Sequence, residues 1–248
     1  MTDQNQPKGK RKIARWRIVV ASILLVVAIV LIFSGPIRNA IIQWNMSRYG
    51  LDKHSAEELA NNRKGKFDYE DVSTLSLDKL IEAQMQAQKL KTIGGVAVPD
   101  VGINLPIFRG VTNASLSFGA GTMTANQEMG KGNYALISHH LFDFAGSSSL
   151  LFSPLENAKE GMKIYLTDKN QIYVYTITDI RKVDPTKGYD YAINPVDGQK
   201  LVTLITCTDR NATQRIVVRG SLEKTMAYNK APKAILKYFS RKYNQQWR

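Results

Sequence analysis

The stretch Leu201-Val202-Thr203-Leu204-Ile205-Thr206-Cys207 is an apolar, β-branched run that ends in the only cysteine of a 248-residue chain. Runs of this length and composition are typical of buried strands. Eight positions after Cys207, Arg215 opens a second run, Ile216-Val217-Val218, and a turn-rich segment separates the two. We therefore expect two neighbouring antiparallel strands that present a thiol and a guanidinium side by side at one strand end.

A third group is needed before the thiol can act as a nucleophile. The chain has three histidines, and two of them, His139 and His140, follow the apolar run 134–137 and Ser138. Consecutive residues of a strand face opposite sides, so we expect only one of the two to face Cys207. The alternative interpretation is a structural cysteine, because free cysteine is often a small core residue.

These residues resemble those of the sortases, the membrane-anchored cysteine transpeptidases of Gram-positive bacteria. The Thr-Leu-x-Thr-Cys signature at 203–207, the downstream Arg215 and the pair Ser138-His139 all match the family. The separation of 68 positions between His139 and Cys207 is also typical. The resemblance covers roughly residues 93–224 and extends upstream to the membrane anchor. It implies a mainly β fold, a closed eight-stranded barrel with short helices.

The resemblance also implies a role for each catalytic residue. Cys207 attacks a peptide carbonyl and forms a thioacyl intermediate, and only the fraction with thiolate and imidazolium together is thought to be competent. His139, which follows the small residue Ser138, is the general acid and then the base, and His140 is a rim residue. Arg215 stays protonated, so it cannot be a base and instead stabilises the substrate or oxyanion. Positive charge on His139 and Arg215 is expected to lower the thiol pKa.

Substrate and partner also follow from the resemblance. The family cleaves a Leu-Pro-x-Thr-Gly sorting signal of a secreted protein between Thr and Gly. It then passes the acyl group to an amine of a cell-wall precursor, usually lipid II. We expect residues of three segments to lie near the catalytic centre, namely Thr206, Ser138, and Ala120, Thr122 and Met123. An apolar groove for Leu and Pro is expected from Ala192, Ile193, Pro195 and Val196.

No cofactor or metal is expected. Some class A sortases hold calcium with carboxylates in the segment before the histidine strand, but residues 119–125 contain no acid here. Calcium prefers several oxygen ligands, carboxylates among them. We therefore predict calcium-independent activity.

The N-terminus carries the strongest charge pattern of the chain, whose formal net charge is +13. Six Lys and Arg residues lie between Lys8 and Arg17, directly before the apolar run 18–33. Basic residues keep such a flank in the cytoplasm and favour anionic headgroups, so the charge does not indicate a nucleic-acid partner. We predict a basic cytoplasmic tail (1–17) and a single transmembrane signal anchor (18–36) that contacts the bilayer through residues 18–33. The alternative is a cleavable signal peptide.

The remaining chain is expected outside the cell. Residues 37–92 are predicted to form a helical stalk, 93–228 the catalytic barrel, and 229–248 a C-terminal helix and tail. Alternation of apolar and polar residues indicates short strands near 96–98, 103–107, 134–137, 162–166, 172–180, 201–205 and 216–222, as in an all-β barrel or sandwich. Residues 113–118 are expected to form a helical turn.

Three alternatives differ in chemistry. A pilin-polymerising sortase usually carries an Asp-Pro-aromatic lid, and no such tripeptide occurs between Leu51 and Ile93. A membrane-tethered cysteine hydrolase would use the same Cys207 and His139 but release its product to water. A non-enzymatic, membrane-tethered binding protein with a barrel fold would not explain why Cys207, His139 and Arg215 occur together. We therefore favour a class A sortase.

Overall fold

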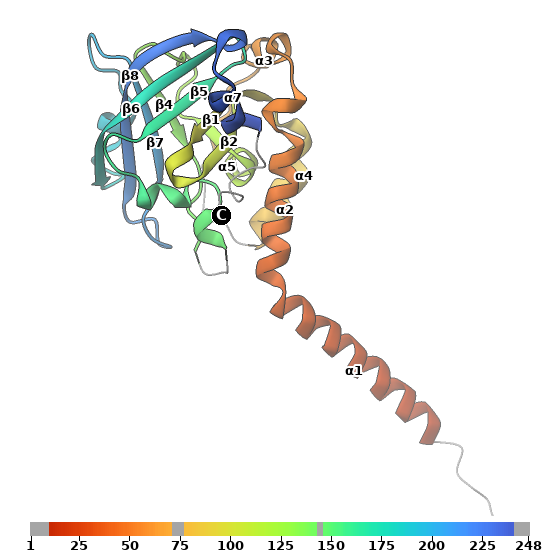
Figure 1. Cartoon of the computed structure of the whole chain (residues 1–248). Helices are drawn as coiled ribbons and strands as arrows, with labels where there is room; N and C mark the ends of the chain where they lie inside the picture. The colour runs from red at the N-terminus through yellow and green to blue at the C-terminus, as the bar shows by residue number, and fades with distance from the viewer. Residues whose placement is uncertain (1–9, 71–76, 143–145, 241–248) are drawn as a thin grey trace, which may run out of the picture.

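A closed barrel dominates the computed structural model, which describes residues 10–70, 77–142 and 146–240 (Figure 1). The strands follow the order β1-β2-β3-β4-β7-β8-β6-β5 around the barrel. Closure leaves no unpaired sheet edge, and it confirms the predicted eight-stranded barrel. The ends of the predicted tails, 1–9 and 241–248, lie outside the described residues. The strands are β1 (Thr92–Val98), β2 (Ile103–Phe108), β3 (Ala120–Thr122), β4 (Asn133–Ile137), β5 (Lys163–Thr167), β6 (Gln171–Val183), β7 (Leu201–Cys207) and β8 (Arg215–Ala227).

Two parallel contacts in the barrel bring the functional strands together. Strand β2 pairs in parallel with β3, and β4 pairs in parallel with β7 from Asn133↔Leu201 to Ile137↔Ile205. The other pairs are antiparallel. Because β4 and β7 run side by side in one direction, the residues after Ile137 lie next to Cys207.

Helix α5 (Asn113–Phe118) connects β2 to β3 where the sequence predicts a helical turn. Thr112 caps its N-terminus, since the Thr112 side chain accepts from the Ser115 backbone N–H and Ser115 Oγ accepts from the Thr112 N–H. This reciprocal arrangement satisfies backbone donors that a helix start leaves open. Strand β3 follows directly, although its three residues were predicted as site neighbours rather than as a strand.

The barrel core follows from strand alternation. Along β4, Tyr134 and Leu136 belong to the main apolar cluster, whereas Ala135 belongs to a second cluster that includes Ala192 of α6 (Tyr189–Ile193). All four side chains are buried. Each fully buried large apolar side chain contributes about 1.5–3 kcal/mol, so this alternation fixes the register of the strand.

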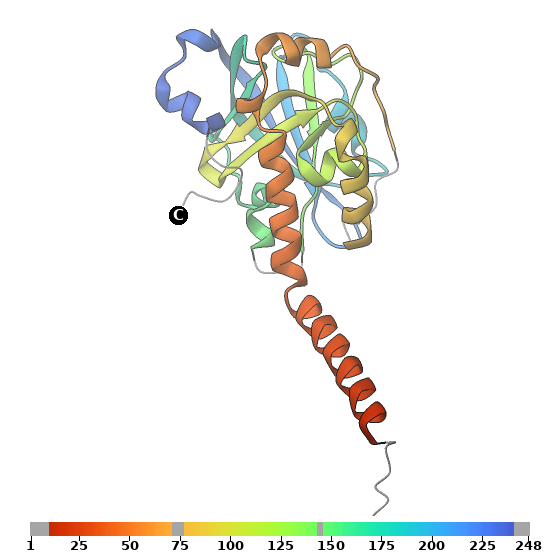
Figure 2. The same ribbon diagram turned by 90° about the vertical axis from the view of Figure 1, so that its right-hand side faces the viewer.

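The helices after α1, in the segment predicted as a helical stalk, form a layer against the barrel. Figure 2 shows α2 running along the barrel wall while α1 projects away from it. Ile42 and Met46 of α2 are fully buried, and Asn45 Nδ2 donates to Gln84 Oε1 of α4 at 2.5 Å. The helices are α1 (Lys10–Ile32), α2 (Ser34–Arg48), α3 (Ala56–Asn62) and α4 (Leu77–Gln86).

Helix α1 carries the predicted membrane segment. Among the described residues, one helix is long and apolar enough to cross a membrane, with a mean hydropathy of 2.4 over Arg15–Ile32 and none of that window buried. The next helix begins at Ser34, two residues before Pro36. Proline is tolerated in a first helical turn, so the chain continues as helix instead of ending there.

The C-terminal helix α7 (Lys233–Ser240) returns to the barrel. Its Phe239 is buried in a small cluster with Leu51, Leu59 and Ala97. Short 3₁₀ helices occupy several connections, namely Leu51–Lys53, Ala87–Lys89, Pro99–Val101, Ser147–Ser149, Ser153–Asn157 and Tyr228–Lys230.

Candidate active site

Cys207 and Arg215 are direct partners across two antiparallel strands. The register of β7 with β8 runs from Leu201↔Ser221 to Cys207↔Arg215. Cys207 is therefore the last residue of one strand and Arg215 the first of the next, as the spacing predicts. The thiol is half-buried.

One cavity of about 210 Å³ collects the predicted catalytic side chains. Cys207, His139 and Arg215 all line it, together with Ser138 and His140. The remaining wall residues are Tyr69, Glu70, Val111, Leu116, Ile137, Phe142, Tyr189 and Ala212.

Tyr69 and Glu70 are wall residues that the sequence analysis missed. They come from the segment before α4, and an isolated parallel bridge between Tyr69 and Val111 holds that segment at the cavity. A single bridge leaves no periodic pattern in the sequence, so no signal marked these two residues.

Both histidines line the cavity, which contradicts the prediction that only one can face Cys207. Strand β4 ends at Ile137, and the Ser138 N–H donates to the Ile205 carbonyl as the last contact with β7. Alternation of faces applies only within an extended strand, and His139 and His140 lie beyond its end. Both are buried, with exposed fractions of 6% and 7%.

The two histidines differ in their partners. The His140 ring stacks on Phe142 with centroids 4.3 Å apart, and its Nε2 lies 3.9 Å from Glu156. Within the described residues the His139 ring forms no hydrogen bond or ion pair. The His140 ring thus has protein partners, the backbone of Cys207 among them, while the ring of His139 is free to bond a group that enters the cavity.

Hydrogen bonds from Ser138 and Thr206 fix the histidine segment. Ser138 Oγ donates to the Gly119 carbonyl at 2.6 Å, and Thr206 Oγ1 donates to the Ser138 carbonyl at 2.9 Å. Both residues are buried, where an unmade hydrogen bond costs about 1–3 kcal/mol. The threonine before the cysteine therefore positions the neighbouring strand end.

Comparison with known proteins agrees with this geometry. A family model described as a sortase domain matches residues 96–223. The chain is 47% identical over 248 residues to sortase A of Streptococcus agalactiae, covering 99% of both chains. The chain belongs to the sortase family. It is a sortase-type cysteine transpeptidase, related to the class A enzymes that anchor surface proteins.

A further relative supports the class, both by its sequence and by its solved structure. This sortase is 37% identical over 211 residues to sortase A of Listeria monocytogenes, covering 83% of this chain and 91% of that protein. A solved structure of L. monocytogenes sortase A matches it with a TM-score of 0.55 and 41% identity, over 61% of this chain and 99% of that one. The apolar helix α1 is consistent with a membrane-anchored sortase.

A loop after β7 sets the direction of Arg215 in this sortase. Arg215 Nη1 donates to the Ala212 carbonyl at 2.7 Å and to the Gln214 carbonyl at 3.2 Å, while its Nε is buried without a hydrogen bond. Asp209 closes the loop by accepting from Thr208 Oγ1 at 2.8 Å and Thr213 Oγ1 at 2.7 Å. These bonds hold the pKa of Asp209 well below its usual range.

Burial keeps the resting pair uncharged. It raises the pKa of the Cys207 thiol, an effect that Arg215 partly offsets and Asp209 reinforces. Burial also lowers the pKa of His139 to about 4, with the charge of Arg215 acting in the same direction. The expected lowering of the thiol pKa is therefore wrong for the resting site, because desolvation outweighs the nearby guanidinium.

The predicted substrate groove does not converge on the thiol. Ile193 and Pro195 line a separate cavity of about 380 Å³, and Val196 is exposed. From the same region, Tyr189 lines the thiol cavity instead, while Ala192 packs beneath it in the second apolar cluster.

The predicted neighbours before β4 also lie elsewhere. Ala120 and Met123 are buried in the apolar clusters, and Thr122 lines a third cavity at the far end of the barrel. Thr122 lies opposite Leu136 in the register of β3 with β4, two positions before Ser138.

Residues that could hold a metal do not cluster in the described part of the chain, where no three His, Cys, Asp or Glu side chains come together. The acid nearest in sequence to residues 119–125 is Glu128, which forms an ion pair with Lys131 at 2.6 Å. Calcium independence stays a prediction.

Proposed function

We propose that this sortase cleaves a Leu-Pro-x-Thr-Gly sorting signal between Thr and Gly and transfers the acyl group to an amine of lipid II. The observation that carries the proposal is the convergence of Cys207, His139 and Arg215 on one cavity. The three residues come from the ends of β7, β4 and β8, and together they supply a nucleophile, a proton carrier and a fixed cation.

The acylation step conserves the one proton that the resting pair holds. The Cys207 thiol passes its proton to the His139 imidazole, and the thiolate attacks the threonine carbonyl carbon. The C–N bond to glycine then breaks as His139 gives that proton to the leaving amine. A thioester remains on Cys207, and the His139 imidazole is neutral again.

The transfer step reverses these roles. The incoming amine attacks the thioester carbonyl and gives a proton to His139, the C–S bond breaks, and the thiolate recovers the proton. Arg215 stabilises the oxyanion of both steps, since its buried Nε–H has no hydrogen-bond partner among the described residues. A charged donor aimed at a developing oxyanion in a water-poor cavity is an effective stabiliser.

The test is mass spectrometry of the full-length protein in neutral detergent, mixed with a Leu-Pro-x-Thr-Gly peptide with and without an amine acceptor. We expect an adduct on Cys207 that the amine converts to a new peptide bond, and none with Cys207→Ala. Free acid in place of amine product would favour hydrolysis. No adduct at all would refute the assigned sorting signal.

We also propose that α1 spans the bilayer with the N-terminus in the cytoplasm and the barrel outside. The basic residues before the apolar window support this orientation. Protease added to intact cells should then remove a C-terminal epitope tag and leave an N-terminal one. Protection of both tags would contradict it.

A further inference from the structure

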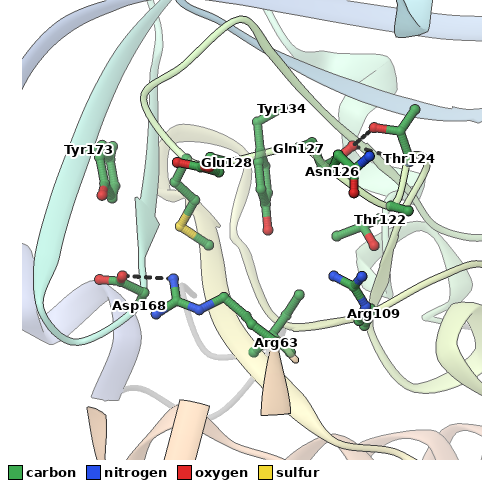
Figure 3. A pocket seen from close by; sticks show the side chains of 13 residues that line it. Arg63, Arg109, Thr122, Thr124, Asn126, Gln127, Glu128, Tyr134, Asp168 and Tyr173 are labelled. Carbon is green, nitrogen blue, oxygen red and sulfur yellow. Dashed lines mark hydrogen bonds and ion pairs between the residues drawn. The ribbon is translucent and has the colours of Figure 1, made fainter. Parts of the chain in front are cut away.

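The third cavity, of about 740 Å³, lies at the barrel end where β4 and β6 begin. We call it the mouth cavity. Figure 3 shows its polar side chains. They come from the end of α3, the end of β2, from β3, β4 and β6, and from the β3–β4 and β5–β6 connections. Nothing in the transpeptidation chemistry uses them.

Both acids of the mouth cavity already have protein partners. Asp168 Oδ2 accepts from Arg63 Nη1 at 2.9 Å, and its Oδ1 accepts from the Asn170 and Gln171 backbone N–H groups. Glu128 pairs with Lys131 at 2.6 Å. The carboxylates therefore leave no negative charge for a second cation.

Arg109 is the cation without such a partner. It is half-buried, its Nε is buried without a hydrogen bond, and no ion pair or hydrogen bond of its side chain exists among the described residues. Its guanidinium carbon Cζ lies over the Phe67 ring, 5.8 Å from the ring centroid. Withdrawing a charged group from water without a partner is costly, so the site favours an incoming anion.

Neutral donors surround the same space. Thr122 Oγ1 accepts from the Gly110 N–H at 2.8 Å, which leaves its own hydroxyl proton without an acceptor in the described structure. Figure 3 shows the Tyr134 hydroxyl pointing into the middle of the cavity, above and between Arg63 and Arg109. Burial raises the pKa of Tyr134, so that hydroxyl stays protonated. The exposed Asn126 amide lies beside Thr122 in the same view.

We propose that the mouth cavity binds an oxyanion, a carboxylate or phosphate group of a polar ligand, with Arg109 as its cationic partner and Thr122, Tyr134 and Asn126 as neutral donors. A guanidinium matches both oxyanions because its fork donates two parallel hydrogen bonds. One unpaired cation fits one negative charge. The volume lies within the range of ligand pockets.

The proposed partners come from three strands of the barrel. Arg109 follows β2, Thr122 belongs to β3 and Tyr134 belongs to β4. A bound oxyanion would therefore contact neighbouring strands at one end of the barrel. The thiol cavity begins at the other end of β4, about 13 Å away for four residues of strand, so the two sites are distinct.

The test measures binding rather than catalysis. Full-length protein in neutral detergent is titrated with sodium phosphate and, separately, sodium acetate at constant ionic strength, and amide chemical shifts are followed by NMR. We expect saturable shifts at residues 109, 122, 126 and 134, with the tighter arm identifying the preferred oxyanion. Arg109→Gln should weaken binding at least about tenfold, which corresponds to about 1.4 kcal/mol.

Two further variants guard the interpretation. Tyr134→Phe removes one hydroxyl without changing the ring and should weaken binding several-fold. Lys64→Gln, an exposed neighbour of Arg63 with the same change in net charge, should leave it unchanged. Equal binding by wild type and Arg109→Gln, equal weakening by Lys64→Gln, or no saturable shift with either anion would overturn the proposal.

Discussion

The cavities at the two ends of the barrel differ in the charge of the side chains that line them. At the thiol cavity, burial disfavours the charged forms of the thiol and the imidazole beside Arg215. At the mouth cavity the two acids form ion pairs with Arg63 and Lys131, and Arg109 has no ion pair among the described residues. In the thiol cavity the reacting groups are thus neutral before substrate binds. In the proposed binding site of the mouth cavity, the guanidinium of Arg109 is a charged group without an ion-pair partner.

The largest expected effect separates the two histidines of the thiol cavity. His139→Ala should lower the transpeptidation rate by about 10²–10⁴-fold, the usual contribution of a general acid–base group. His140→Ala should leave a measurable rate, because that ring already has Phe142, Glu156 and the Cys207 backbone as partners. Steady-state kinetics with a peptide and an amine acceptor measures both. The reverse pattern would reassign the proton carrier.

The burial of neutral His139 also predicts that the folded protein loses stability at acid pH. His139 has a folded-state pKa of about 4, against about 6.5 in an unfolded chain. The unfolded state binds more protons between these values, so stability falls as the pH drops from 6.5 towards 4, by up to about 3 kcal/mol.

His139→Asn removes that titration and should flatten this part of the curve. Urea unfolding at several pH values between 4.5 and 7.5 gives the comparison with wild type, since the carboxylates contribute to both proteins. Parallel curves would mean that His139 is not held neutral by burial.

A smaller effect is expected from the loop that directs Arg215. Asp209→Ala removes the acceptor that joins Thr208 to Thr213, so the carbonyl of Ala212 loses its fixed place beside the guanidinium. We expect kcat/KM to fall about tenfold, equivalent to about 1.4 kcal/mol. Asp197→Ala, an exposed change of the same charge, serves as the control. A similar loss in both variants would point to net charge instead.

The smallest expected effect is that of calcium on the rate. Calcium takes six to eight oxygen ligands, and the β3–β4 connection has Glu128 already paired with Lys131. Adding calcium to chelator-treated enzyme should leave transpeptidation unchanged. A large increase in rate would show that the pair opens to bind the ion.

The strands that carry the chemistry were predictable because they are long and strongly patterned. The run from Leu201 to Cys207 and the run after Arg215 pair as expected, and α5 spans the predicted residues. Strand β3 was missed because Ala120–Thr122 is too short to show alternation. The histidine pair was misjudged because the end of β4 is set by tertiary pairing, which the local sequence does not display.

The direction of the thiol pKa shift and the existence of the mouth cavity could be recognised only from the three-dimensional structure. Desolvation of Cys207 and His139 depends on what covers them, including Tyr69 and Glu70 from a distant segment. Arg63, Arg109, Tyr134 and Asp168 are separated by at least 25 positions from one another, and no motif links them. Sequence signatures mark residues that react, while residues that bind are assembled from many elements.

Helix α2 makes the tether of this sortase an arm of fixed length. Ile42 and Met46 clamp it to the barrel, and its 15 residues span about 22 Å. A flexible linker of the same length would let the barrel and its thiol move through a wide volume. A packed helix instead holds the thiol at one distance from the end of α1. With α1 in a bilayer, as proposed, a substrate would reach the thiol only where its cleavage site lies within that narrow zone.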